Sequence, residues 1–211
     1  MTERLVEGLE ARNLQLWRGD RCLFRQLDIV VGGGRLVHVQ GRNGAGKTSL
    51  MRILCGLALP DAGEVLWRSR RIERVREEFH LAIAWLGHRD GLKQDLTALE
   101  NLCFSNGLRR TCAARQARAA LGEGGLDAVA DLPVRVLSAG QRRRVAFARV
   151  QTSGAPLWLL DEPFANLDAA STSFIAGRLS AHLAEGGSIV LAAHRLPSGL
   201  TEHAAVPLDA A

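Results

Sequence analysis

The order of apolar and polar residues changes along the chain. Up to residue 40 apolar residues alternate with polar ones, which is typical of strands buried on one face. This pattern predicts strands at Leu5–Leu16, Leu23–Val31 and, after a turn of three glycines, Arg35–Gln40. The chain therefore begins with a β-rich layer.

A helix is predicted directly after this layer. From Gly46 the apolar spacing becomes helical, and the helix should end near Leu59-Pro60. Its apolar face comprises Leu50, Ile53, Leu54 and Leu57. Further strands are predicted at Glu64–Trp67 and Leu81–Leu86.

The middle of the chain is predicted to be helical. Thr97 and Glu100 form a capping-box pattern, in which the two side chains satisfy free backbone N–H groups at a helix start. The stretch up to about Ala130 is rich in Ala, Leu and Arg, and Ser138 with Gln141 marks a second helix start. We therefore expect a helical subdomain at about residues 90–140.

The last third of the chain predicts a βαβ unit. Leu157–Leu160 is a continuous apolar run, typical of a buried parallel strand. A helix at Ala170–Leu183 and a strand at Ser188–Ala193 follow. Together these elements predict an α/β fold with a mixed-sheet core, a β-rich N-terminal layer and a helical subdomain.

Length and composition narrow the class of protein. A chain of 211 residues suits one α/β domain spanning residues 1–211, and 47% hydrophobic with 23% charged residues is globular. No apolar run approaches the roughly 18 to 20 residues that span a bilayer, and the first ten residues do not resemble a secretory signal. We therefore expect the chain in the cytosol, with reduced thiols at the scattered Cys22, Cys55, Cys103 and Cys112.

The net charge of +5 suits nucleic acid, nucleotide phosphates or an anionic membrane surface, and it does not choose among them. Most basic residues are dispersed, except in Arg142–Arg144 and Arg68–Arg76, and no aromatic residues are interleaved to stack bases. Nucleic acid is therefore not favoured as a partner.

A phosphate-binding loop is the strongest motif. Residues 41–48 match G-x-x-x-x-G-K-[ST] between a predicted strand and a predicted helix, the context that this motif requires. The expected nucleotide-binding residues are Gly41, Arg42, Asn43, Gly44, Ala45, Gly46, Lys47, Thr48 and Ser49. Lys47 would reach the β- and γ-phosphates and Thr48 would bind Mg²⁺. Kinases, GTPases and molecular motors share this loop, so it indicates a nucleotide triphosphate without fixing the reaction.

Two carboxylates follow the apolar run. Asp161 ends a strand that can lie beside the strand of the phosphate loop, and from there it can reach Mg²⁺ from the opposite side. Glu162 comes next, where a carboxylate can polarise the attacking water as general base. The alternative is a charged pair that merely ends a strand.

Four motifs in order resemble the ATP-binding-cassette (ABC) ATPases. Leu137-Ser138-Ala139-Gly140-Gln141 resembles their signature sequence, Asn166-Leu167-Asp168 their D-loop, and His194 their switch histidine. The resemblance implies a P-loop NTPase of ABC type that binds ATP and Mg²⁺ and hydrolyses ATP with Lys47, Glu162 and His194. It also implies that Ser138, Gly140 and Gln141 act in trans, so that a homodimer or a paired second cassette completes each site.

Two positions depart from the family pattern. His88 stands where the Q-loop glutamine is expected, and we assign it to the Mg²⁺ site because an imidazole can bind the ion or hold its water. Trp17 lies one place from the expected adenine-stacking aromatic and could equally pack on the β-rich layer.

Within this family, residues 87–93 and 96–102 are similar to the ATP-binding subunits of cytochrome c maturation transporters, the haem exporter family. Gly41–Ser49, the Pro60–Val65 turn and the short length of the chain are also similar to these subunits. The resemblance implies a peripheral protein on the cytoplasmic face of the bacterial inner membrane, bound to an integral, CcmB-like membrane subunit. No haem is expected on this chain, because it has no C-x-x-C-H motif and no evident axial ligand pair.

Four alternatives remain at this point. One is an ABC transporter subunit that serves another substrate. An ABC protein of translation or DNA repair would use the same chemistry, but such proteins normally carry two cassettes or a long coiled-coil insertion. A binding module that no longer hydrolyses ATP would not need Glu162 and His194. A haem-binding structural protein would need a ligand motif.

Overall fold

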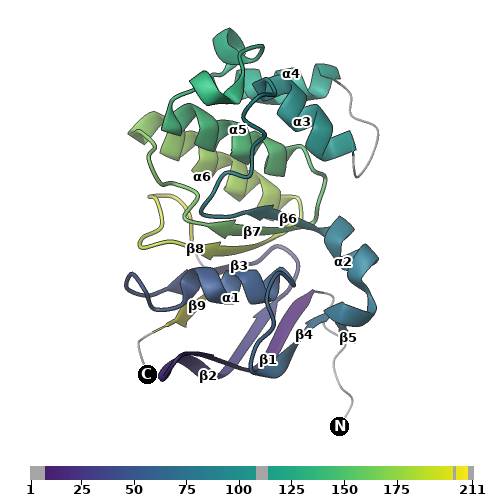
Figure 1. Cartoon of the computed structure of the whole chain (residues 1–211), viewed down its shortest axis with the longest axis vertical. Helices are drawn as coiled ribbons and strands as arrows, with labels where there is room; N and C mark the ends of the chain where they lie inside the picture. The colour runs from purple at the N-terminus through teal and green to yellow at the C-terminus, as the bar shows by residue number, and fades with distance from the viewer. Residues whose placement is uncertain (1–7, 108–113, 202, 209–211) are drawn as a thin grey trace.

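The computed structural model describes residues 8–107, 114–201 and 203–208. Its strands form two sheets, one antiparallel in the order β2-β1-β4-β5 and one parallel in the order β6-β7-β8-β3-β9. Figure 1 shows the antiparallel sheet at one end, the parallel sheet in the middle, and helices at the other end. The predicted α/β class is confirmed.

The antiparallel sheet is the β-rich layer expected from the sequence. Its strands are β1 (Leu9–Arg18), β2 (Arg21–Val31), β4 (Ala62–Trp67) and β5 (Arg70–Arg71). The parallel sheet comprises β3 (Leu36–Gln40), β6 (Ile83–Leu86), β7 (Leu157–Asp161), β8 (Ser188–Ala192) and β9 (Ala204–Pro207). Every residue of β7 and β8 is buried, which explains their continuous apolar runs.

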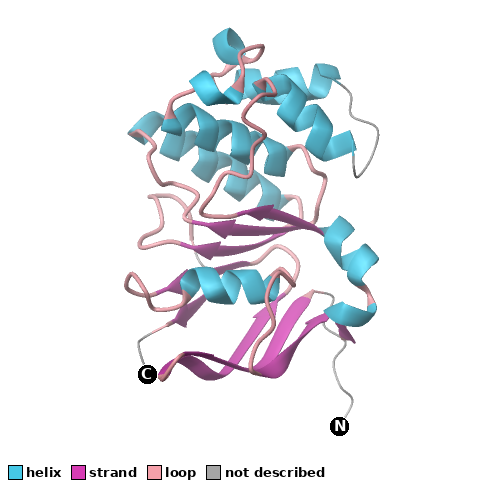
Figure 2. Cartoon of the chain, in the orientation of Figure 1, coloured by secondary structure: helices cyan, strands magenta, loops and turns pink. Residues whose placement is uncertain are grey.

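Helices cover both faces of the parallel sheet (Figure 2). Helix α1 (Lys47–Leu54) lies between the two sheets. Helix α2 (Arg76–Ala82) comes later in the chain and leads directly into β6. On the other face lie α5 (Ala139–Gln151) and α6 (Ala169–Ala184), and beyond them α3 (Ala98–Gly107) and α4 (Ala114–Glu123). Short 3₁₀ turns occur at η1 (Ile72–Arg74), η2 (Asp127–Val129) and η3 (Val134–Val136).

Three groups of buried apolar residues hold these layers together. The first joins the antiparallel sheet, α1 and the near face of the parallel sheet, through side chains such as Leu14, Leu50 and Val190. The second joins the far face of that sheet to α5 and α6, and the third lies within the helical segment around Leu102 and Leu121. A separate apolar group supports the helical subdomain predicted at about residues 90–140.

Local signals placed most elements well. Both capping boxes form: the Glu100 N–H donates to Thr97 Oγ1 over 3.1 Å, and the Gln141 N–H donates to Ser138 Oγ over 3.2 Å. In turn, the Glu100 side chain accepts from the Thr97 N–H, and the Gln141 side chain accepts from the Ser138 N–H. Helices α3 and α5 therefore start where the sequence predicts them.

Three expectations about the elements were wrong, and one strand was missed. Helix α1 ends at Leu54 because Gly56 turns the chain at φ 71°, which leaves Leu57 54% exposed instead of on the apolar face. The strand expected from Leu81 begins at Ile83, after α2. The short β9 was not foreseen, and β7 does not lie beside β3, because β8 is inserted between them.

Among the residues that the structure describes, no helix combines the length and the apolar character needed to cross a bilayer. Cys22, Cys55 and Cys103 are free thiols, as expected, while Cys112 lies outside the described residues. Burial, with a smaller effect from the Asp161 carboxylate, raises the pKa of the Cys55 thiol, so this cysteine stays protonated in the core.

Candidate functional site

The phosphate loop connects β3 to the first turn of α1, where free backbone N–H groups attract anions. Gly41 and Gly46 have φ angles of 150° and 102°. A Cβ atom at Gly41 would lie 2.6 Å from the Leu208 carbonyl oxygen, so only glycine fits there. The loop therefore has the backbone conformation that close contact with phosphates requires.

Lys47 is held inside this loop. Its ammonium group donates to the Gly41 carbonyl over 2.8 Å and to the Arg42 carbonyl over 3.3 Å, and the residue is 7% exposed. A positive charge is thus fixed under the loop, where the terminal phosphates of a nucleotide would lie.

A cavity of about 520 Å³ opens in front of the loop. Its wall comprises Arg18, Arg21, Leu23, Asn43, Gly44, Gly46, Lys47, Thr48, Ser49, His88, Asp161, Glu162, Ala165 and His194. The cavity therefore brings together five segments that are distant in the sequence: the β1–β2 hairpin, the phosphate loop, the residues after β6, the end of β7 and the residues after β8.

Asp161 lies at the centre of the site. It is fully buried, and its Oδ2 accepts a hydrogen bond of 2.8 Å from the Thr48 hydroxyl. Within the described part of the chain its Oδ1 is buried without a hydrogen-bond partner. Burial raises the pKa of Asp161, although the Thr48 bond and the charges of His88, Arg143 and Lys47 act in the opposite direction.

Glu162 follows in an unusual backbone conformation. Its φ of 51° lies in the left-handed region, which costs a non-glycine residue about 1 kcal/mol or more. Its N–H donates to the Ala192 carbonyl over 2.8 Å, and its carboxylate lies 3.8 Å from the Lys47 ammonium group. The side chain is 26% exposed and belongs to the cavity wall, so its carboxylate can meet both substrate and water.

His194 contacts the phosphate loop directly. Its Nε2 lies 2.8 Å from Oδ1 of Asn43, which is consistent with a hydrogen bond from the ring N–H. His88 belongs to the same wall, on the segment that follows β6. Both histidines predicted for the site are therefore in the cavity.

The three residues predicted to act in trans do not lie in this cavity. Ser138, Gly140 and Gln141 lie at the start of α5, where Ser138 is exposed, and none belongs to the cavity wall. Asp168 caps α6 by accepting from the Ser171 N–H over 2.8 Å, and this bond holds the pKa of Asp168 below its usual range. The role of the signature residues in trans stays a prediction.

Trp17 also lies outside the cavity wall. It is 43% exposed at the end of β1, and its backbone N–H donates to Asp61 over 2.6 Å. Its proposed stacking on adenine stays a prediction. Arg18 and Arg21, opposite each other across the hairpin, line the cavity instead, and the Gly19-Asp20 turn between them was the signal that could have identified them.

The chain resembles known proteins over most of its length. Residues 24–165 match the family described as ABC transporter. The chain is 46% identical over 190 residues to "Cytochrome c biogenesis ATP-binding export protein CcmA 1" of Salmonella typhimurium, covering 89% of each protein. It is also 46% identical over 187 residues to the CcmA protein of Yersinia pestis, covering 89% of this chain and 86% of the relative.

Solved structures share the fold. "Structure of ATP binding subunit of ABC transporter" aligns with a TM-score of 0.80 at 25% identity, covering 88% of this chain and 79% of that one. "Dimeric Structure of MJ0796, a Bacterial ABC Transporter Cassette" aligns with a TM-score of 0.80 at 24% identity, covering 89% and 88%.

Proposed function

The chain belongs to the ABC transporter family, among its cytochrome c biogenesis ATP-binding proteins, and from this premise we propose that it hydrolyses ATP to drive a membrane partner. The c-type cytochrome biogenesis role comes from the relatives, whose name describes an export protein. One observation carries the hydrolytic part: Thr48, Asp161 and Glu162 meet at the wall of the cavity in front of the phosphate loop.

The arrangement suits phosphoryl transfer to water. Backbone N–H groups of residues 41–49 surround the phosphates, and Lys47 offsets the negative charge that they carry. Glu162 accepts a proton from the attacking water, and His194, held against Asn43, helps to place that water beside the terminal phosphate. The catalysis is electrostatic and positional, with no covalent intermediate required.

The donor groups at Asp161 fit Mg²⁺. A buried carboxylate oxygen without a hydrogen-bond partner in the described chain lies next to a hydroxyl, and Mg²⁺ prefers oxygen ligands. Thr48 and Asp161 would hold the ion together with the phosphates of the nucleotide. When bound, the ion neutralises charge on the phosphates.

We expect His88 to support this ion indirectly. Replacing His88 with alanine should raise the Mg²⁺ concentration for half-maximal ATPase activity about tenfold, the usual cost of losing a supporting group around a metal. His88→Gln, which restores the residue expected in the Q-loop, should recover most of the affinity. An unchanged Mg²⁺ requirement in the alanine variant would remove His88 from the metal site.

A dimer is proposed because the cavity lacks the signature residues of its own chain. Ser138, Gly140 and Gln141 lie elsewhere on the surface, and a second copy that turned its α5 start toward the cavity could supply them. A related cassette has been solved as a dimer. Homodimerisation is therefore the simplest way to complete two sites.

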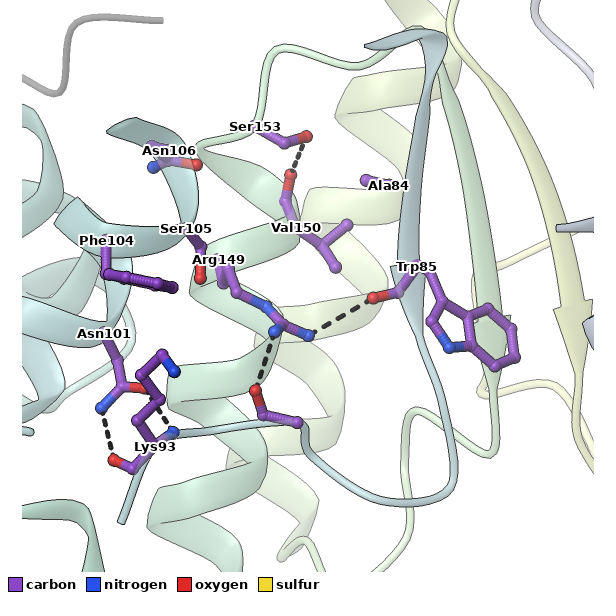
Figure 3. A pocket seen from close by; sticks show the side chains of 11 residues that line it. Ala84, Trp85, Lys93, Asn101, Phe104, Ser105, Asn106, Arg149, Val150 and Ser153 are labelled. Atoms are coloured by element: carbon purple, nitrogen blue, oxygen red, sulfur yellow. Dashed lines mark hydrogen bonds between the residues drawn. The ribbon is translucent and has the colours of Figure 1, made fainter. Parts of the chain in front are cut away.

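A groove beside the helical subdomain is the proposed docking site for the membrane partner. It lies between β6, α3 and α5, measures about 370 Å³, and includes Trp85, Lys93, Asn101, Phe104, Asn106 and Arg149 (Figure 3). Phe104 is 47% exposed, and the Lys93 ammonium group lies 4.5 Å from its ring centroid. An apolar side chain flanked by cations fits a cytoplasmic segment of an integral, CcmB-like subunit, which would hold this chain on the cytoplasmic face of the inner membrane.

Capture from native membranes tests the transporter assignment. A tagged chain should recover a multi-spanning membrane subunit, and Phe104→Asp should reduce that recovery about tenfold while ATPase activity persists, because the charge disrupts an apolar contact. Leu132→Asp is a matched control, since Leu132 is 44% exposed outside the groove. Recovery of ribosomes or DNA-repair proteins without a membrane subunit would contradict the assignment and favour an ABC ATPase that acts on nucleic acid.

A further inference from the structure

Arg143 is a buried cation behind the site. It lies in α5, five residues after Ser138, and is only 4% exposed. One terminal nitrogen, Nη2, donates to the Asp161 carbonyl over 2.6 Å and to the Glu162 carbonyl over 2.7 Å. The guanidinium group thus holds the main chain of both proposed catalytic carboxylates.

The other terminal nitrogen of Arg143 reaches a second segment. Nη1 donates to the Gly87 carbonyl over 2.8 Å and to Asp90 Oδ1 over 3.0 Å. Gly87 and Asp90 flank His88, so a single planar group joins the loop that follows β6 to the end of β7. Only arginine has the rigid fork that can serve four acceptors in two directions.

The same loop is also held from the groove side. Arg149, further along α5, donates to the Gly91 carbonyl over 3.1 Å and to the Asp90 carbonyl over 3.2 Å. Figure 3 shows the Arg149 side chain lying between the groove and the strand that carries Trp85. Residues 87–91 therefore lie between two arginines of one helix, one behind the catalytic carboxylates and one in the proposed docking groove.

The backbone at Glu162 needs such support. A left-handed glutamate is strained, and it persists only when its surroundings fix it. Its N–H is bonded to Ala192 in β8, and its carbonyl accepts from Arg143 and, over 3.1 Å, from the Ala165 N–H, so both sides of the residue are restrained. Loss of the Arg143 contact would leave the carbonyl with the bond from Ala165, a residue of the same turn, and would let the carboxylate move away from the position that hydrolysis requires.

We propose that Arg143 is a positioning residue that fixes Glu162 and links its position to the loop beside the docking groove. The inference deepens the proposed function and rests on Glu162 being the general base. A membrane partner that shifts residues 87–91 would move the acceptors of Arg143 and so change the place of Glu162. Arg143 does not itself touch substrate; it acts through the main chain.

Arg143→Lys tests the proposal, because an ammonium group keeps the charge but cannot span both segments. We expect kcat to fall by about ten- to a hundredfold, the scale that misplacement of a reacting group produces, with the Kd for ATP changed less than about twofold. Arg118→Lys is the matched control, since Arg118 pairs with Asp131 on the exposed surface. Thermal unfolding of both variants reports whether the fold is kept.

A double variant separates positioning from a general structural effect. If Arg143 acts through Glu162, adding Arg143→Lys to Glu162→Gln should lower kcat less than about twofold further, because coupled residues are not additive. Equal fractional losses in both backgrounds would overturn the proposal. Should Arg143→Lys fail to fold, Asp90→Asn removes only the negative charge that Arg143 faces and should lower kcat about threefold, a small loss because the three carbonyl contacts remain, with Asp131→Asn as its control.

Different results would refute the general base and the positioning residue. If Glu162→Gln hydrolyses ATP like the wild type, the proposed base is wrong and the inference falls with it. If Glu162→Gln is inactive while Arg143→Lys and Asp90→Asn both turn over like the wild type, only the positioning role is wrong.

Discussion

Replacing Glu162 with glutamine should leave ATP binding intact and lower hydrolysis by about 10²- to 10⁴-fold, the usual contribution of a general base. The amide keeps the size of the side chain but cannot accept the proton of the attacking water. Binding should persist because the phosphate loop and Lys47 are untouched, although the ion pair of 3.8 Å between Lys47 and Glu162 is lost. Single-turnover hydrolysis and a nucleotide titration measure the two effects separately.

The same variant should accumulate as an ATP-bound dimer. ATP hydrolysis normally lets the ATP-bound dimer separate. A chain that binds ATP without cleaving it should therefore elute from a size-exclusion column at twice the mass of the monomer when ATP and Mg²⁺ are present. Glu185→Gln, at the exposed end of α6, is the control. Wild-type turnover in Glu162→Gln would show that another group takes the proton.

Two inactive chains should restore activity when mixed, if the signature residues act in trans. Lys47→Ala should disable the phosphate loop, and Gly140→Asp should place a carboxylate against the terminal phosphate of the partner's nucleotide. Each variant alone should lose about a hundredfold or more in ATPase activity, because each breaks or opposes a charge contact in both sites. A mixed dimer retains one site with an intact loop and an intact signature.

Equal mixing should recover about a quarter of the wild-type rate, since half the dimers are mixed and each has one complete site of two, if the sites act independently. Gly140→Ala controls for packing, because a Cβ atom there lies 3.1 Å from the Asn166 carbonyl oxygen of the same chain. Activity of the unmixed Gly140→Asp protein close to the wild type would contradict the signature role.

The site residues show where sequence information was sufficient. The phosphate loop is a contiguous motif whose chemistry depends on its own backbone, so its eight positions could be identified without knowledge of the fold. Asp161 and Glu162 were identified because a buried strand ended in charge. The structure confirms that these residues meet, with 2.8 Å between the Thr48 hydroxyl and Asp161.

Other features of the site depended on distant contacts. Arg143 belongs to a run of three arginines that only indicated local charge in the sequence, yet the fold buries it against carbonyls of two other segments. The hairpin residues Arg18 and Arg21 line the cavity in place of Trp17 because the direction of side chains at a strand end is set by pairing with the neighbouring strand.

The sequence by itself determined the local structure of this protein: the glycine loop, the two capping boxes and the buried strands β7 and β8. The loop and the capping boxes depend on backbone conformations and hydrogen bonds among residues that are close in the chain. The two strands are marked by their own apolar runs, although the strands they pair with are distant in the sequence. The tertiary structure alone decided that β8 lies between β3 and β7, that α1 ends before Leu57, and that Arg143 faces inward. Those outcomes depend on which distant surfaces pack together, and a periodic pattern shows that a face is buried without identifying what buries it.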